Sequence, residues 1–157
     1  MIYRKLNQDT IDIYIDYLKV AMREAPNEMI TDTLDEEGIR KRITDPFFQR
    51  TTSILAIDDE GVIGRIEFHF YGCIQDGYKM AYVDWVYVLP KYRRRGVAQS
   101  LFREFEKECV AFGIDQYYLI RSLEHEADRF YNAFSSASLT TEPILRKYMS
   151  DKSNSTN

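Results

Sequence analysis

Three strand patterns between residues 51 and 88, followed at once by a long helical pattern, constrain the fold more than any other feature. The strand patterns are "TTSILAID" (51–58), "VIGRIEFHFY" (62–71) and "MAYVDWVYV" (80–88). Short turn sequences separate them, so the three strands are expected to form an antiparallel meander. The third is nearly apolar and therefore expected to lie inside the sheet. Alternation in the second gives one face Ile66, Phe68 and Phe70, and the other Arg65, Glu67 and His69.

The helical pattern covers residues 96–113. Its apolar stripe consists of Val97, Leu101, Phe105, Cys109 and Phe112. Gly113 stands where a helix C-terminus favours glycine. A strand over 116–122 follows, and a strand–helix–strand unit within one sheet has to pair in parallel.

The remaining elements are expected around this centre. The fold class is α/β (α+β), a mixed central sheet with helices on both faces, in one domain over residues 1–149. The expected elements are a strand at 2–6, a helix over 8–26 capped by Asp9 or Thr10, a helix from Thr33 with Glu36 completing a capping box, a helix at 123–134, a last strand at 142–149 and a disordered polar tail at 150–157.

Composition limits the classes of function. The formal net charge of −4 disfavours general nucleic-acid or membrane binding and is compatible with a cationic partner. Two cysteines, Cys73 and Cys109, and two histidines, His69 and His125, predict neither a disulfide framework nor a metal site. No apolar run reaches the roughly 18 residues of a membrane span, so we expect a soluble cytoplasmic protein.

The stretch "VLPKYRRRGVAQSLF" (88–102) joins the third strand to the long helix. Free N–H groups in the first turn of a helix, together with the helix dipole, form an anion site. Gly96, which lacks a Cβ, and the small Ala98 would let a phosphate approach the backbone. A solvated basic helix start and a nucleic-acid patch are the alternative interpretations of the three arginines.

This stretch resembles the acetyl-CoA pyrophosphate motif of GNAT-type N-acetyltransferases, Gln/Arg-x-x-Gly-x-Gly/Ala after a strand ending in Val-x-Pro. The resemblance covers residues 1–149 and implies acetyl-CoA as cosubstrate. It implies that backbone amides of the loop bind the pyrophosphate and that the preceding strand bonds the pantetheine. The loop residues are Arg93, Arg94, Arg95, Gly96, Val97 and Ala98, and the strand residues are Val86 and Val88.

The resemblance also implies a role for Tyr131. "EADRFYNAF" is similar to the family's Ala-x-x-Phe/Leu-Tyr pattern, whose Tyr lies near the CoA sulfur, so Tyr131 would protonate the departing thiolate. The chain departs from the family pattern at Glu124, where Asn is usual, and at Ser135-Ser136, where Gly-Phe is usual. The second departure affects the acceptor side.

Direct transfer to an amine requires a group that accepts the ammonium proton. Asp84 interrupts an apolar strand and is the preferred candidate; an ion pair with Arg65 or a strand-edge position is its alternative role. Glu67 is the second candidate, with a paired row beside Arg65 as its alternative. Neither cysteine has an obvious base nearby, so a covalent acyl-enzyme is not predicted.

Residues 24–37 carry six acids and no Lys or Arg. In GNAT-like folds this region overhangs the acceptor groove, so a small cationic amine, such as a polyamine or aminoglycoside, or a lysine or N-terminal amine is expected as acceptor. Acids in the first turn of a helix are the alternative explanation. A non-catalytic acyl-CoA sensor is the alternative function, and a homodimer remains open.

Overall fold

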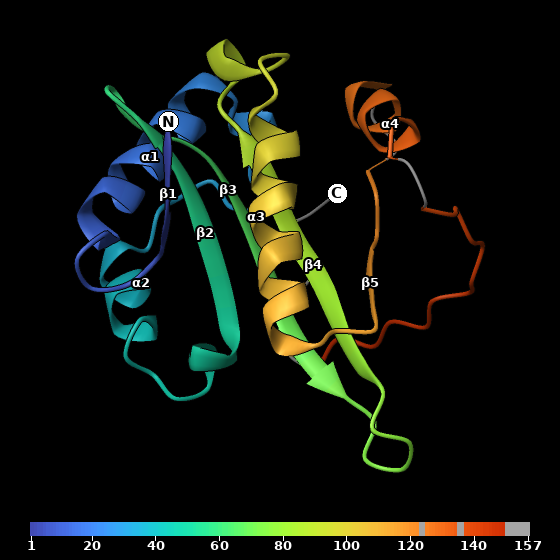
Figure 1. The fold of residues 1–157 in the computed structure, drawn as a ribbon. Helices are drawn as coiled ribbons and strands as arrows, with labels where there is room; N and C mark the ends of the chain where they lie inside the picture. The colour runs from blue at the N-terminus through green and yellow to red at the C-terminus, as the bar shows by residue number, and fades with distance from the viewer. Residues whose placement is uncertain (123–124, 135–136, 150–157) are drawn as a thin grey trace. The chain divides into compact units, whose positions relative to one another are not determined.

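The computed structural model describes residues 1–122, 125–134 and 137–149. The chain divides into two compact units, Met1–Ile120 and Arg121–Asn157, which are described separately. A single domain over 1–149 stays a prediction. The first unit contains β1 (Ile2–Lys5), α1 (Ile11–Glu24), the 3₁₀ turn η1 (Pro26–Glu28), α2 (Glu36–Arg42), η2 (Phe48–Arg50), β2 (Thr51–Asp58), β3 (Gly61–Gly72), β4 (Lys79–Val88), η3 (Pro90–Tyr92), α3 (Val97–Phe112) and β5 (Gln116–Leu119) (Figure 1). The second contains α4 (His125–Asn132).

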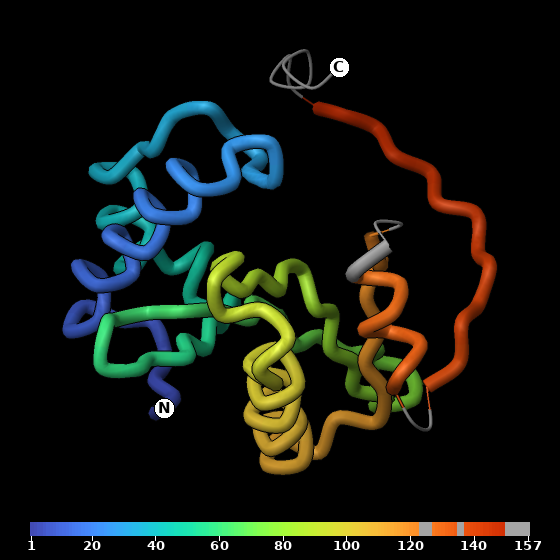
Figure 2. Tube along the Cα trace, turned by 90° about the horizontal axis from the view of Figure 1, so that it is seen from above, coloured from blue at the N-terminus to red at the C-terminus, as the bar shows by residue number. Residues whose placement is uncertain are grey.

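The five strands form one sheet in the order β1-β2-β3-β4-β5. The first three pairings are antiparallel, and β4 pairs with β5 in parallel. The predicted meander and the parallel strand–helix–strand unit are therefore confirmed. Figure 2 shows α3 on one side of the sheet and α1 with α2 on the other, as the fold class required.

The apolar stripe of α3 packs on one face of the sheet. Leu101 and Phe105 are fully buried, and the Phe105 ring lies 4.7 Å from that of Phe68 on β3. The apolar stripe was predicted to include Phe112, and this prediction is wrong, because the Phe112 side chain is 56% exposed. In the last turn of α3 its ring contacts Phe70 on one side and solvent on the other. Phe102, which the prediction left out, is buried against Phe105 and widens the stripe.

The opposite face of the sheet is covered by α1. Tyr14, Ile15 and Tyr17 are buried there. The Tyr17 hydroxyl donates a hydrogen bond of 3.1 Å to the Tyr87 carbonyl and so ties α1 to β4. Thr10 occupies the N-cap position, as predicted, although its hydroxyl donates to the Lys5 carbonyl and accepts from the Asn7 N–H instead of capping the helix.

The start of the second helix differs from the predicted capping box. Asp35 is the N-cap of α2, and its carboxylate accepts the Gly38 N–H at 2.9 Å. Asp is at least as good an N-cap as Thr, and its short side chain reaches the N–H group three residues on. Thr33 and Glu36 therefore do not form the box.

The end of the chain also differs from expectation. Strand β5 stops at Leu119 instead of residue 122, and residues 142–149 have no regular secondary structure. Ile144-Leu145 and Tyr148-Met149 are adjacent apolar pairs, which do not alternate between two faces as a half-buried strand requires. The predictions for Glu124, Ser135-Ser136 and the tail at 150–157 lie outside the described residues.

Candidate active site

The helix α3 begins without a side-chain cap. Its N-cap residue is Gly96, with φ of 78°, and Arg94 two residues earlier also has a positive φ of 60°. Since glycine offers no capping oxygen, Gly96 leaves the first-turn N–H groups at Val97 and Ala98 without a cap. This is the local structure that binds an anion at a helix start.

Gly96 also leaves space for a ligand above the loop. A Cβ at this position would have no atom within 4 Å, and the positive φ would strain any residue that carried one. Both properties fit a phosphate group that lies against the backbone. The residues therefore fit the pyrophosphate of acetyl-CoA, although the assignment of the loop residues stays a prediction.

Strand β4 has an edge that opens halfway along its length. It pairs with β5 from Met80 to Val83, and no pairing continues beyond Val83 within the described chain. The Leu89 N–H donates to β3 at Ile63. Because backbone groups alternate along a strand, those of Val86 and Val88 point to the opposite edge, where β5 has separated. These are the two residues predicted to bond the pantetheine.

The three arginines have different surroundings. Arg93 donates through Nε to the Val88 carbonyl at 3.0 Å and binds the Glu28 carboxylate with both terminal nitrogens. The Arg95 guanidinium lies 5.6 Å from the Tyr92 ring centroid. Arg94, whose positive φ places its backbone in the left-handed region, is exposed. The Arg93 side chain therefore organises the loop instead of forming part of an open basic patch.

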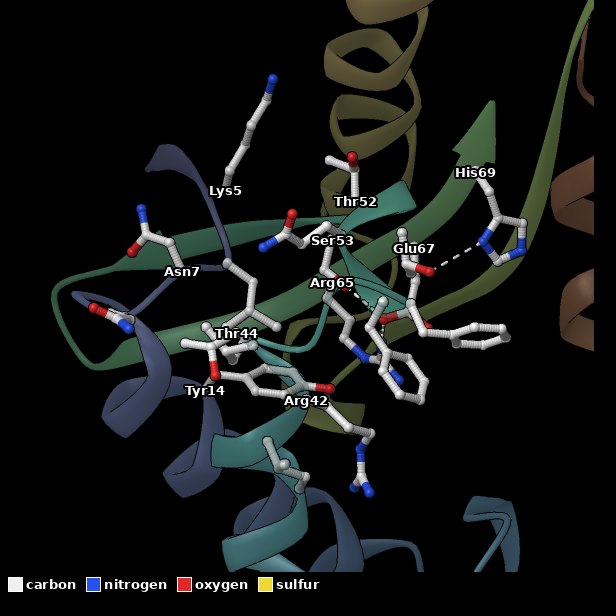
Figure 3. Close-up of a pocket in the computed structure, with 18 of the residues that line it drawn as sticks. Lys5, Asn7, Tyr14, Arg42, Thr44, Thr52, Ser53, Arg65, Glu67 and His69 are labelled. Atoms are coloured by element: carbon white, nitrogen blue, oxygen red, sulfur yellow. Dashed lines mark hydrogen bonds and ion pairs between the residues drawn. The ribbon is translucent and has the colours of Figure 1, made fainter. Parts of the chain in front are cut away.

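A cavity of about 960 Å³ lies on the face of the sheet that α1 covers. Its walls include Tyr14 of α1 and Arg42 of α2, and its sheet side includes Glu67 and His69 of β3 (Figure 3). Asp84 of β4 also lines it. The polar face predicted for β3 is therefore the floor of a cavity.

Glu67 is held in a fixed position at this floor. Its Oε2 accepts hydrogen bonds from the Ser53 hydroxyl at 2.5 Å and from Arg65 at 2.8 Å. The alternative role suggested for Glu67, a pair with Arg65, is thus confirmed. The alternative ion pair between Asp84 and Arg65 is not formed, since Arg65 is engaged by Glu67.

Asp84 owes its position to an irregularity in β4. Glu67 pairs with Trp85 and Phe68 with Val83, so Asp84 is an extra residue without a register partner on β3. A bulge of this kind re-aims a side chain and bends its strand. Asp84 is exposed, and it stands where pairing with β5 has just ended.

The acids of residues 24–37 are largely engaged by cations of the same chain. Glu28 binds Arg93, Asp35 binds Arg42, Glu36 binds Lys19 and Glu37 binds Lys41. The acidic stretch therefore carries much less uncompensated charge than its sequence suggests. Its expected role in attracting a cationic acceptor has correspondingly less support.

Tyr131 belongs to the second unit, where it lies on α4. Its ring contacts those of Phe130 and Phe134, with centroids 5.1 and 6.0 Å away. Burial raises the pKa of the Tyr131 hydroxyl, which keeps it protonated at neutral pH. The role of this hydroxyl toward the CoA sulfur stays a prediction.

Sequence reasoning missed the residues that wall the cavity from other elements. Tyr14 and Arg42 are far from β3 in sequence, and each has an ordinary helical context. No local signal could have grouped them with Glu67. Among the described residues, no cluster of three or more His, Cys, Asp or Glu side chains could hold a metal ion, and no helix has the length and apolar character needed to cross a bilayer.

An open strand edge beside an uncapped helix start suits a protein that binds a long ligand with phosphates at one end. Consistent with this arrangement, residues 14–135 match the model of the acetyltransferase (GNAT) family. The chain therefore belongs to the GNAT family of acetyltransferases. A search of curated protein sequences finds no match.

Solved structures with the same fold include several acetyltransferases. A ribosomal-protein-alanine N-acetyltransferase from Brucella melitensis biovar Abortus 2308 aligns with a TM-score of 0.71 and 14% identity, over 94% of this chain and 100% of that one. The aminoglycoside acetyltransferase meta-AAC0020 from a soil metagenomic sample aligns with a TM-score of 0.74 and 14% identity, over 95% of each chain. An integron cassette protein from V. cholerae gives 0.74 and 12% identity, over 96% and 93%. At such identities the likeness concerns the fold alone.

Proposed function

We propose that this chain transfers the acetyl group of acetyl-CoA directly to a primary amine. The observation that carries the proposal is the double position of Asp84. This residue lines the cavity and also begins the stretch of β4 whose edge has separated from β5. Strand β4 therefore connects its separated edge, which suits the thioester arm, with the cavity, which suits an acceptor.

The loop and strand would hold the donor. Backbone N–H groups from Arg94 to Ala98 would bind its pyrophosphate, while Arg93, whose own N–H donates to the Pro90 carbonyl, would hold the loop in place. The open backbone groups of Val86 and the N–H of Val88, whose carbonyl accepts from Arg93 Nε, would bond the amides of the pantetheine arm. Acetyl-CoA, when bound, supplies an activated thioester. The chain itself would supply position, an open helix terminus and the movement of protons.

Two side chains would move protons. Asp84 would accept a proton from the incoming ammonium at its carboxylate, directly or through water, because an exposed carboxylate at the cavity can reach such a group. Tyr131 would donate its phenolic proton to the departing sulfur. The thiolate of a thiol with a pKa of about 8.5, by analogy with cysteine, is a fair leaving group, so the contribution of Tyr131 is modest.

The proposed acceptor is a small primary amine, cationic in solution. The carboxylate that would meet its ammonium is Asp84 in the cavity, since Glu67 is bound by Ser53 and Arg65 and the acids of residues 24–37 largely have partners of their own. Aminoglycosides and the alanine of ribosomal proteins, which the names of two structural neighbours mention, belong in the first acceptor panel.

The test is release of free thiol from acetyl-CoA by the purified chain in the presence of a broad amine panel. We expect at least one amine to give turnover. Tyr131→Phe should lower kcat by about 100-fold, at the lower end of general acid catalysis, and leave acetyl-CoA affinity unchanged. Phe130→Leu on the same helix serves as control for packing effects.

The sensor alternative makes a different prediction for the same assay. It predicts acetyl-CoA binding by calorimetry without thiol release for any amine. Absence of binding in the folded chain would reject both readings.

A further inference from the structure

We infer that Glu28 is a positioning residue for acetyl-CoA binding, acting through Arg93. The inference rests on the proposed function, since it concerns the loop assigned to the pyrophosphate. Glu28 belongs to η1, between α1 and α2, and is 65 residues from Arg93 in the chain. No feature of the loop sequence points to it.

Two hydrogen bonds join the Arg93 guanidinium to the Glu28 carboxylate. Arg93 Nη1 donates to Glu28 Oε1 at 3.1 Å, and Nη2 donates to Oε2. The planar guanidinium fixes direction as well as distance in such a pair. The hydrogen bonds from Arg93 lower the pKa of the Glu28 carboxyl, so the pair stays ionised at neutral pH.

The Arg93 guanidinium makes two further contacts. Its Nε donates to the Val88 carbonyl at 3.0 Å, and its centre lies 5.3 Å from the Tyr87 ring centroid. Arg93 thus joins η1, the end of β4 and the loop before Gly96. The Val88 carbonyl lies on the open edge of β4, so the loop and the edge share one fixed point.

This arrangement has a consequence for charge. Acetyl-CoA is a polyanion, and a loop that needed only positive charge would gain nothing from an acid bound to its arginine. If Glu28 were merely a nearby negative charge, its removal would strengthen acetyl-CoA binding. If Glu28 positions the loop, its removal weakens binding, because the loop must then be ordered at the expense of binding energy. The two explanations predict opposite signs.

The experiment measures the Kd of acetyl-CoA by calorimetry for the wild-type chain and three variants. Glu28→Gln removes the charge, and Glu28→Asp keeps the charge but shortens the reach. We expect both to raise Kd, by about 5-fold or more. Glu37→Gln is the matched control, since it removes one acid from the same stretch. The partner of Glu37 is Lys41 of the same helix α2, whose Nζ lies 2.7 Å from Glu37 Oε1. Its Kd should stay within about twofold of wild type.

The outcomes separate the possibilities. Tighter or unchanged binding by Glu28→Gln overturns the positioning role, and so does wild-type affinity in Glu28→Asp or an equal loss in Glu37→Gln. Thermal melting of each variant shows whether it is folded at the temperature of the titration; Glu28 is exposed, and we expect all three variants to be folded. If the wild-type chain binds no acetyl-CoA, the proposed function fails instead.

Discussion

At the scale of residues, the cavity holds two carboxylates in opposite situations. Glu67 is bound by Ser53 and by Arg65, whose guanidinium also lies near the rings of Tyr14 and Trp85, at 5.5 and 5.9 Å. Arg65 Nε is buried without a hydrogen-bond partner among the described residues. Asp84 by contrast is exposed. The first arrangement stabilises the sheet face, and the second leaves a carboxylate available to an acceptor.

Substitution of the two carboxylates should therefore separate stability from activity. Asp84→Asn should change the free energy of unfolding by less than about 0.5 kcal/mol and lower kcat by roughly 100-fold. Glu67→Gln should destabilise the fold by about 1–3 kcal/mol, because Arg65 is then left partly buried beside a neutral partner. Urea unfolding and thiol-release kinetics measure the two effects. Full activity of Asp84→Asn would exclude Asp84 as the proton acceptor.

At the scale of elements, the site depends on how one strand ends and one helix begins. The bulge at Asp84 coincides with the point where β4 and β5 separate, and the turn before α3 uses a left-handed glycine. Parallel strands that diverge leave unpaired backbone groups, which a ligand with amides can satisfy. The site is thus formed mainly by backbone whose geometry these local irregularities determine.

Gly96→Ala tests the helix start. The methyl group meets no protein atom, so the cost to folding is limited to the strain of a positive φ, about 1 kcal/mol. It would enter the space assigned to phosphate, and we expect acetyl-CoA affinity to fall at least about 10-fold, with a larger loss for Gly96→Val.

Gly77→Ala is the matched control for this substitution. Gly77 has a similar φ of 71° and equally open surroundings, in the loop between β3 and β4. It should lose comparable stability while keeping wild-type affinity in calorimetry. An undiminished affinity in folded Gly96→Ala would remove the pyrophosphate assignment.

At the scale of the whole molecule, the first unit is held by α3 packed on the sheet, and Cys109 reports on that packing. Burial, with Glu106 and Glu108 nearby, raises the pKa of the Cys109 thiol to about 11. Cys73 is exposed. The thiolate is the reactive form, and a raised pKa reduces its population at any pH below that value.

Alkylation at pH 8 should therefore modify Cys73 alone in the native chain. Cys109 should react only when urea unfolds the first unit, since its pKa then falls to the ordinary value of about 8.5 and the thiol becomes accessible. Mass spectrometry of the labelled peptides measures both rates. Equal rates in the native state would mean that α3 is not packed as described.

The strands, the long helix and the loop at Gly96 could be predicted from sequence because their signals are local. Alternation, an apolar stripe and a strand–Pro–Gly–helix junction depend on neighbours in the chain, and the sheet order followed from short connections. The errors arose where two local signals competed, as at Thr33 and Asp35, or where a strand needs alternation as well as apolar residues, as at 142–149.

The sequence by itself determined the mixed sheet, the family resemblance and the loop, because backbone conformation there is set by glycine, proline and periodicity. Tertiary structure alone decided the partner of each charge. It joined Glu28 to Arg93 and Glu67 to Arg65, and placed Asp84 in a bulge facing the cavity. Ion pairs and cavities form between residues distant in sequence, so they depend on packing that no local pattern encodes.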